Sequence, residues 1–114
     1  MAALKRNEIV AIVGDRPYGE AGIEIEFFGK TTLVPRGGAL FGIKSGSPIV
    51  IAFTCKETEA SNTYKFVLQK PIFVKKVGPV HEHVREITQL FMRRFEDHIR
   101  KYPSEWYMFN RIWI

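Results

Sequence analysis

The order of apolar and polar residues near the start of the chain predicts two strands of different kinds. Residues 8–13 carry Ile-Val-Ala-Ile-Val without an intervening polar residue, a pattern typical of a short strand buried on both faces. Gly14 and Pro17 end this run. Residues 23–28 alternate instead, which predicts a half-exposed strand. Its expected inward side chains are Ile23, Ile25 and Phe27, and its outward ones are Glu24 and Glu26.

A short helix and another strand are expected next. Residues 36–44 place Ala39, Leu40 and Ile43 at helical spacing, and Gly46 follows where a left-handed cap would end the helix. The glycines in this stretch weaken a helix, so close packing against a sheet or a ligand is a better explanation for them than propensity. Residues 48–55 again lack polar alternation and predict a strand buried on both faces. A strand, a helix and a strand in succession favour a right-handed crossover and a parallel pair.

The second half of the chain predicts a hairpin and one long helix. Residues 56–62 are polar and turn-like, and the alternation that resumes at Tyr64–Leu68 indicates an antiparallel return strand. Residues 80–101 carry an apolar stripe at spacings of three and four. Glu96 and Arg100 are expected to pair on the exposed side of that helix. The stripe consists of Val80, Val84, Ile87, Phe91, Phe95 and Ile99.

Together these elements predict an α/β fold. The sheet is expected to be mixed and mainly parallel, with residues 8–13 and 48–55 at its centre, Tyr64–Leu68 antiparallel, and flanking helices, of which the one at 80–101 covers one face. No repeat, linker or low-complexity stretch divides the 114 residues, so a single domain over 1–114 is expected.

Composition narrows the classes of partner without choosing among them. The chain is 46% hydrophobic and 25% charged, which is typical of a globular protein, and its net charge of +5 favours nucleic acid, an anionic lipid surface or a phosphorylated substrate. The single cysteine, Cys55, excludes an intramolecular disulfide and is expected to be a buried thiol. Nowhere are there the ~20 consecutive apolar residues that a membrane span needs, so any membrane contact is expected to be peripheral.

Asp15 is the first candidate for chemistry. It follows the strand expected at 8–13, and the carboxyl ends of strands in open α/β sheets are where ligands usually bind. The structural alternative is an Asp that caps the turn before Pro17.

Motifs spread over nearly the whole chain resemble one family. In order they are Glu8-Ile9-Val10-Ala11 with Asp15 behind it, Phe27-Phe28-Gly29, Pro35-Arg36-Gly37 leading through Ala39-Leu40 to Gly46-Ser47-Pro48-Ile49-Val50, and Tyr102-Pro103-Ser104-Glu105-Trp106 with Arg111-Ile112-Trp113. This order resembles the carboxyl-terminal half of the bacterial lipid A biosynthesis (lauroyl/myristoyl) acyltransferases.

The resemblance implies a partial glycerolipid-acyltransferase-like fold. It also implies a parent enzyme that moves a fatty acyl chain from acyl carrier protein to a lipid A precursor at the cytoplasmic face of the bacterial inner membrane, with neither metal nor cofactor. Asp15 matches the family's Asp and would support catalysis. Arg16 lies where the family varies, and with Phe27, Phe28 and Gly29 it would belong to the substrate-binding region. In the alternative, the two phenylalanines simply join the core.

The chain also departs from the family. The family's His-x4-Asp/Glu dyad, in which His acts as the general base, lies upstream of the Asp and Phe-Phe-Gly segments, and no such segment precedes Asp15 here. The 114 residues are therefore expected to be a carboxyl-terminal fragment without transferase activity of its own. Exposed apolar surface and a homo-oligomer are expected for the same reason.

A literal His-x4-Glu does occur later, at His81 and Glu86. It is expected to be a solvated helix start, because it follows the other motifs and because residues five apart on a helix point about 140° away from each other. His81 and His83 are also badly spaced for a helical metal site.

The closing aromatic residues are expected to pack back on the sheet rather than lie at a bilayer interface. They are Trp106, Tyr107, Phe109 and Trp113, with the aliphatic Ile114 at the end.

A different class of function is a stand-alone basic module that binds anionic lipid or nucleic acid. It is supported by the net charge of +5 and by the pairs Lys75-Lys76 and Arg93-Arg94. Nucleic acid is the less favoured partner, because the chain lacks the basic and aromatic pattern on a sheet face that single-strand readers use.

Overall fold

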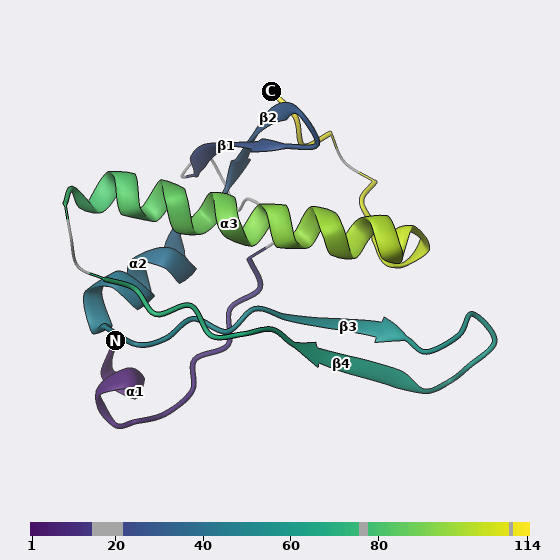
Figure 1. Ribbon diagram of the computed structural model, residues 1–114, viewed down its shortest axis with the longest axis horizontal. Coiled ribbons are helices and arrows are strands. Elements are labelled where there is room, and N and C mark those ends of the chain that lie inside the picture. Colours follow the sequence, from purple (N-terminus) through teal and green to yellow (C-terminus); the bar gives the residue numbers. More distant parts are fainter. Residues whose placement is uncertain (15–21, 76–77, 110) are drawn as a thin grey trace.

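The computed structural model describes residues 1–14, 22–75, 78–109 and 111–114. A long helix, α3, lies between two small antiparallel sheets, β1–β2 and β3–β4, and a shorter helix, α2, packs beside its first half (Figure 1). The elements in chain order are α1 (Ala2–Lys5), β1 (Ile23–Phe27), β2 (Lys30–Val34), α2 (Gly37–Ser45), β3 (Ala52–Lys56), β4 (Tyr64–Leu68), α3 (Val80–Lys101) and the 3-10 helix η1 (Pro103–Glu105).

Helix α3 confirms the prediction from the apolar stripe. It spans Val80–Lys101, the predicted range, and the buried face includes Val84, Phe95 and Ile99 from the stripe. Ile87 and Phe91 are partly buried against the same core. The long amphipathic pattern identified this element because a helix of this length is specified mainly by its own periodicity.

Strand β1 also has the predicted orientation. Its residues are alternately buried and exposed, with Ile23, Ile25 and Phe27 inward. It pairs antiparallel with β2 from Ile23↔Val34 to Phe27↔Lys30. The β1–β2 hairpin therefore contributes one apolar face, which packs on α3.

Helix α2 starts one residue later than expected and ends at Ser45, and the next residue, Gly46, has a φ of 70°, which is the left-handed cap predicted for it. Gly42 confirms the packing explanation for one of the glycines: a Cβ placed there would lie 2.5 Å from Cδ1 of Ile49. At Gly37 and Gly38 a Cβ would meet nothing within 4 Å among the described atoms, so the structure shows no close packing at these two positions.

The hairpin predicted in the middle of the chain is confirmed, but its first strand differs from the prediction. β3 pairs antiparallel with β4 from Ala52↔Leu68 to Lys56↔Tyr64. Along β3, Phe53 and Cys55 are buried while Ala52 and Thr54 are exposed, so the strand is covered on one face and not on both. The Cys55 thiol is free and buried, as expected.

The prediction of a buried strand at residues 8–13 is wrong. These residues form no helix or strand, and their apolar side chains are exposed, up to 96% for Ile9. The predicted parallel pair fails with it, because the two described sheets, β1–β2 and β3–β4, are both antiparallel hairpins. Strand-like composition does not supply a partner strand, and without one the run stays uncovered. The fold is a mixture of helices and small antiparallel sheets and not a mainly parallel sheet.

Candidate functional site

The Phe-Phe-Gly motif forms the turn of the β1–β2 hairpin. Phe27 ends β1 and pairs with Lys30, the first residue of β2, so the turn itself is Phe28 and Gly29. Their φ angles are 49° and 75°, and positive values at both positions are typical of a two-residue type I′ turn. Gly29 adopts a positive φ readily, whereas the positive φ of Phe28 costs ~1 kcal/mol or more of backbone strain. Contacts from elsewhere have to hold Phe28 in place.

A buried carboxylate on α3 provides the main contact. The backbone N–H of Phe28 donates to Oε1 of Glu96 over 2.8 Å, and Glu96 is only 6% exposed. A guanidinium N of Arg100 lies 3.6 Å from Oε2 of the same carboxylate, and the Arg100 guanidinium stands 5.0 Å above the Phe28 ring. The turn is thereby fixed through its backbone and through its ring.

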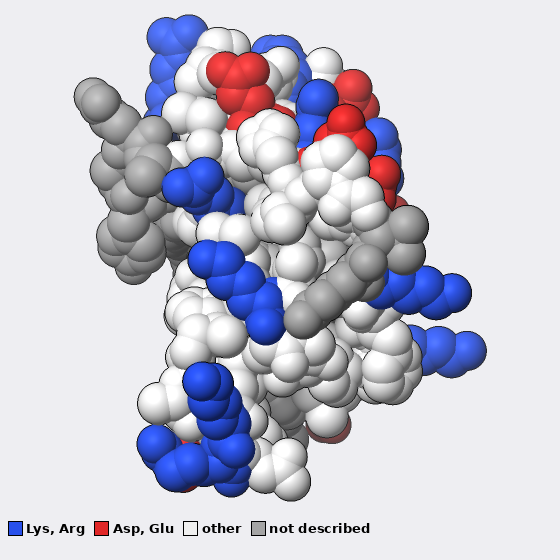
Figure 2. Space-filling model, turned by 90° about the vertical axis from the view of Figure 1, so that its left-hand side faces the viewer, with Lys and Arg blue, Asp and Glu red and all other residues white. Residues whose placement is uncertain are grey.

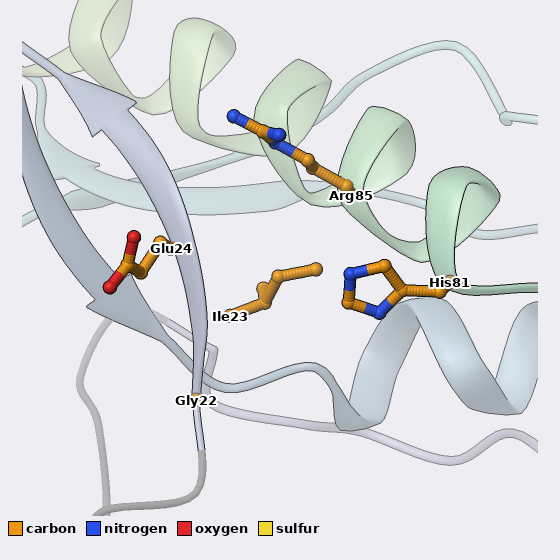
Figure 3. Close-up of a pocket in the computed structure, with 5 residues that line it drawn as sticks. All are labelled: Gly22, Ile23, Glu24, His81 and Arg85. Atoms are coloured by element: carbon orange, nitrogen blue, oxygen red, sulfur yellow. The ribbon is translucent and has the colours of Figure 1, made fainter.

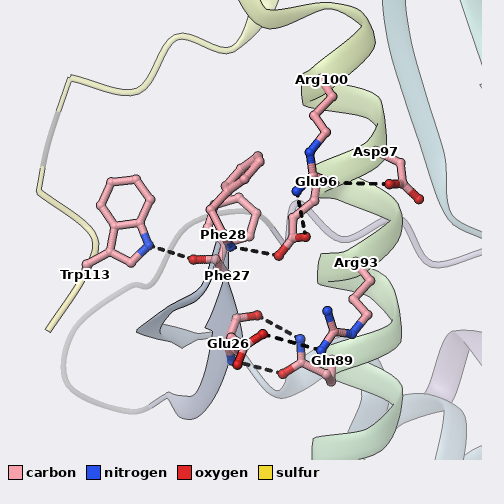
Figure 4. Close-up of polar contacts among 9 residues, drawn as sticks. All are labelled: Glu26, Phe27, Phe28, Gln89, Arg93, Glu96, Asp97, Arg100 and Trp113. Atoms are coloured by element: carbon pink, nitrogen blue, oxygen red, sulfur yellow. Dashed lines mark hydrogen bonds and ion pairs between the residues drawn. The ribbon is translucent and has the colours of Figure 1, made fainter.

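Strand β1 is also attached to α3 at Gln89, about two turns before Glu96 along the helix. The Gln89 side chain accepts from the Glu26 N–H over 2.9 Å and donates to the Glu26 carbonyl over 2.7 Å, as a neighbouring strand would. Arg93 lies 3.5 Å from the Glu26 carboxylate. Figure 4 shows this row of side chains reaching from one side of α3 to β1 and its turn: Gln89, Arg93, Glu96 and Arg100.

Phe27 lies at the centre of the aromatic core. It is 0% exposed, and its ring packs against the adjacent Phe28 ring at 4.7 Å between centroids and against three rings from elsewhere in the chain. These are Phe95 at 5.9 Å, Trp106 at 5.7 Å and Trp113 at 6.3 Å between ring centroids. Nε1 of Trp113 also donates to the Phe27 carbonyl over 2.9 Å. The prediction that the closing residues pack back is confirmed for Trp106 and Trp113, whereas Tyr107, Phe109 and Ile114 are exposed.

A shallow pocket of about 290 Å³ opens between the start of β1 and the first turns of α3 (Figure 3). Its lining residues are Gly22, Ile23, Glu24, His81 and Arg85. The His81 ring and the Ile23 side chain point toward each other, while Glu24 extends from the other side of β1 and Arg85 lies about one turn further along α3 than His81. Imidazole and guanidinium groups donate hydrogen bonds and a carboxylate accepts them, so the pocket suits a small polar group that bears hydroxyls and negative charge.

The local His81 and Glu86 pair lies on α3, where its spacing turns the two side chains about 140° apart, and of the two only His81 lines the pocket. Among the residues that the structure describes, no group of three or more His, Cys, Asp and Glu side chains is arranged to hold a metal ion.

A second titratable cluster lies at the other end of α3. The His98 ring stacks on Phe53 with 4.2 Å between ring centroids, and the resulting burial lowers the pKa of the imidazole. The charge of Glu105 opposes this shift in pKa, and that of Lys101 adds to it. Oε1 of Glu105 accepts from the Lys56 N–H over 2.6 Å. These contacts join β3 to the end of α3 and have a structural role.

Comparison with known proteins decides the family. A family model described as bacterial lipid A biosynthesis acyltransferase matches residues 1–114. The chain belongs to this family. It is 25% identical over 111 residues to phosphatidylinositol mannoside acyltransferase of Mycobacterium tuberculosis, an alignment that covers 97% of this chain and 33% of that protein. It is 24% identical over 111 residues to the protein of the same name from Mycolicibacterium smegmatis, with 97% and 34% covered. The chain spans about a third of the length of these relatives.

Five site residues were predicted from the sequence, and the structure describes three of them. Phe27 is in the core, and Phe28 and Gly29 form the turn that Glu96 holds. Asp15 and Arg16 lie outside the described residues. The buried strand on which the argument for Asp15 was based is not present, so its catalytic role is now supported by the family resemblance alone.

Sequence reasoning missed the residues of α3 that hold the motif. Glu96 was expected on the exposed side of the helix, whereas it is buried. Its spacing contained a signal, because it follows the buried residues Thr88 and Met92 at steps of four along one face of α3. For Gln89, nothing in the sequence indicated a contact with a residue 63 positions away.

Proposed function

We propose that this chain is the carboxyl-terminal part of an enzyme that transfers a fatty acyl chain from acyl carrier protein to a hydroxyl of a lipid A precursor. In that reaction the acceptor oxygen attacks the thioester carbonyl, a C–O bond forms, the C–S bond breaks and the carrier thiol leaves, while a base takes the hydroxyl proton. The match of the family model to residues 1–114 is the observation that carries the proposal.

The pocket between β1 and α3 is the proposed place for the polar part of the acceptor. The relatives are named for a phosphatidylinositol mannoside, which combines a phosphate with sugar hydroxyls. Arg85 and His81 would donate to a phosphate or hydroxyl oxygen, and Glu24 would accept from a hydroxyl. Asp15 in a supporting catalytic role and Arg16 in substrate binding remain part of the proposal.

An anionic membrane surface is the proposed setting, at the cytoplasmic face of the bacterial inner membrane. In the described part of the chain no helix is long and apolar enough to cross a membrane. Lys and Arg side chains occur along the whole height of the side drawn in Figure 2, while Asp and Glu gather toward its upper end. This distribution would attract the lower part of that side to anionic lipid.

A chimera tests the transferase proposal. In it, the 111 aligned residues of the M. smegmatis relative are replaced by this chain. We expect the folded chimera to transfer acyl chains from an acyl carrier protein thioester, with a higher ratio of activity on a lipid A precursor to activity on phosphatidylinositol mannoside than the unaltered relative shows. The 114-residue chain alone is expected to give no turnover, because no upstream dyad precedes Asp15. A folded but inactive chimera, or robust turnover by the chain alone that His81→Ala abolishes, would contradict the proposal.

Arg85→Ala in the same chimera tests the pocket. Loss of one charge-assisted hydrogen bond to a phosphate, ~1.5 kcal/mol, should raise KM for the acceptor about tenfold and leave the melting temperature unchanged. The matched control is Arg93→Ala on the same helix, since Arg93 is exposed and outside the pocket. Equal KM values for the two variants would remove Arg85 from acceptor binding.

A further inference from the structure

The β1–β2 sheet has neighbours along both of its edges. On the β1 side, Gln89 binds the outward N–H and carbonyl of Glu26, and Glu96 binds the N–H of Phe28. On the β2 side, the N–H of Ile114 donates to the Thr31 carbonyl over 3.0 Å. Another strand cannot be added to this sheet without displacing these contacts.

The two edges of the β3–β4 sheet differ from each other in their hydrogen bonding. On the β3 side, the outward N–H of Lys56 is bound by Glu105. On the β4 side, the pairing of Glu57 with Thr63 and of Gln69 with Ile51 fixes which residues bond within the hairpin. Because these pairs alternate, the backbone groups of three β4 residues point away from β3, namely Tyr64, Phe66 and Leu68. Among the described residues none of these groups has a hydrogen-bond partner.

Strand β4 also lies at the rim of the molecule, on the side of β3 away from α3 (Figure 1). The side chains of its three outward-bonding residues share the uncovered face of the hairpin, and Phe66 at the middle is 66% exposed. Edge strands in natural proteins are usually protected by Pro, by charge or by a cover. The one charged residue of β4, Lys65, pairs with the buried Cys55 and so lies on the opposite face.

We infer that β4 pairs antiparallel with β4 of a second copy of the chain, about a two-fold axis at Phe66. In this register Phe66 faces the partner's Phe66, and Tyr64 faces the partner's Leu68. The outward backbone groups of both strands become hydrogen-bonded, and two hairpins form one four-stranded sheet with aromatic and aliphatic cross-strand pairs. The inference is independent of the proposed acyl transfer.

Charge supports a second copy as the partner and supports this register. Lys65 falls opposite the partner's Val67, so the two lysines are not opposed. Two residues beyond the strand, Lys70 falls opposite the partner's Asn62, in a hairpin loop that carries Glu57 and Glu59. The acidic tip of each hairpin therefore lies beside a lysine of the other copy.

Cross-linking of Phe66→Cys tests the register. Directly opposed hydrogen-bonded residues have Cα atoms ~5.5 Å apart, within the range for a disulfide. We expect the 114-residue chain with Phe66→Cys to form a covalent dimer under mild oxidation and the chain with Phe73→Cys to form none, although Phe73 is 75% exposed. Equal cross-linking of both variants would contradict the register.

Light scattering on the unmodified chain tests the pairing itself. A concentration-dependent dimer is expected, and Phe66→Lys, which opposes two charges at the axis, should raise its Kd at least tenfold while circular dichroism stays unchanged. Phe73→Lys should leave the Kd unchanged. A monomeric unmodified chain would overturn the inference, as would a dimer unaffected by Phe66→Lys. If the chain is monomeric and Phe66→Lys abolishes binding to phosphatidylglycerol vesicles, the face binds lipid and the inference is wrong.

Discussion

Phe27→Ala is expected to lower the free energy of unfolding by about 3–5 kcal/mol, a large part of the 5–15 kcal/mol that stabilises an ordinary domain. Phe27 is 0% exposed, and its ring packs between those of α3 and those of the chain's last residues. Its removal would leave a cavity where β1, α3 and the carboxyl-terminal segment meet. The neighbours of a cavity relax only partly, so the lost contacts are not recovered.

Urea unfolding followed by circular dichroism measures this effect. The matched control is Phe73→Ala, which removes the same side chain from a position that is 75% exposed and should change the free energy of unfolding by no more than ~0.5 kcal/mol. A cost below ~1 kcal/mol for Phe27→Ala would mean that the aromatic cluster does not form the core in solution. In that case Phe27 would be free to line a substrate site, as the family resemblance implies.

The elements that could be predicted from the sequence are those specified by nearby residues. The stripe of α3 repeats over 22 residues, and the alternation of β1 distinguishes its two faces within five. The β3–β4 hairpin joins strands that are close in sequence. In each case the pattern that specifies the element lies within one short stretch, so periodicity was sufficient.

The predictions that failed required a distant partner. Residues 8–13 have the composition of a buried strand, but their state depends on whether another strand lies beside them, and no property of Ile9 or Val13 reports that. The predicted parallel pair with residues 48–55 rested on the same assumption. Composition indicated that the run can form a strand and could not indicate its neighbour.

The site divides in the same way. The sequence order identified Phe27-Phe28-Gly29 as a motif, and Gly29 is where a turn with positive φ requires it. The contact that fixes the turn joins Phe28 to Glu96, 68 residues later. The i,i+4 spacing correctly predicted that Glu96 and Arg100 pair, but the pair was expected on the exposed side of the helix. That spacing describes one helix, and the burial of Glu96 is imposed by the turn packed against it.

Glu96→Leu is expected to cost about 1–3 kcal/mol of stability, because it leaves the Phe28 N–H partly buried without its acceptor. Glu96→Gln keeps an oxygen at the same position and should cost less than ~1 kcal/mol. A change in the free energy of unfolding does not show which contact has been lost. Amide hydrogen exchange does, and it should accelerate at least tenfold at Phe28 in the Leu variant and stay near the unmodified rate in the Gln variant.

Gln89→Leu is the reciprocal control, because Gln89 binds the N–H of Glu26, two residues before Phe28 on the same edge of β1. We expect it to accelerate exchange at Glu26 and to leave Phe28 protected, whereas Glu96→Leu should do the opposite. Two separate effects would show that α3 holds β1 through two independent attachments and that the Phe28-Gly29 turn depends on Glu96. If both variants instead release both amides together, β1 leaves α3 as one unit, and the strained turn is maintained by the aromatic core around Phe27 and not by the Glu96 carboxylate.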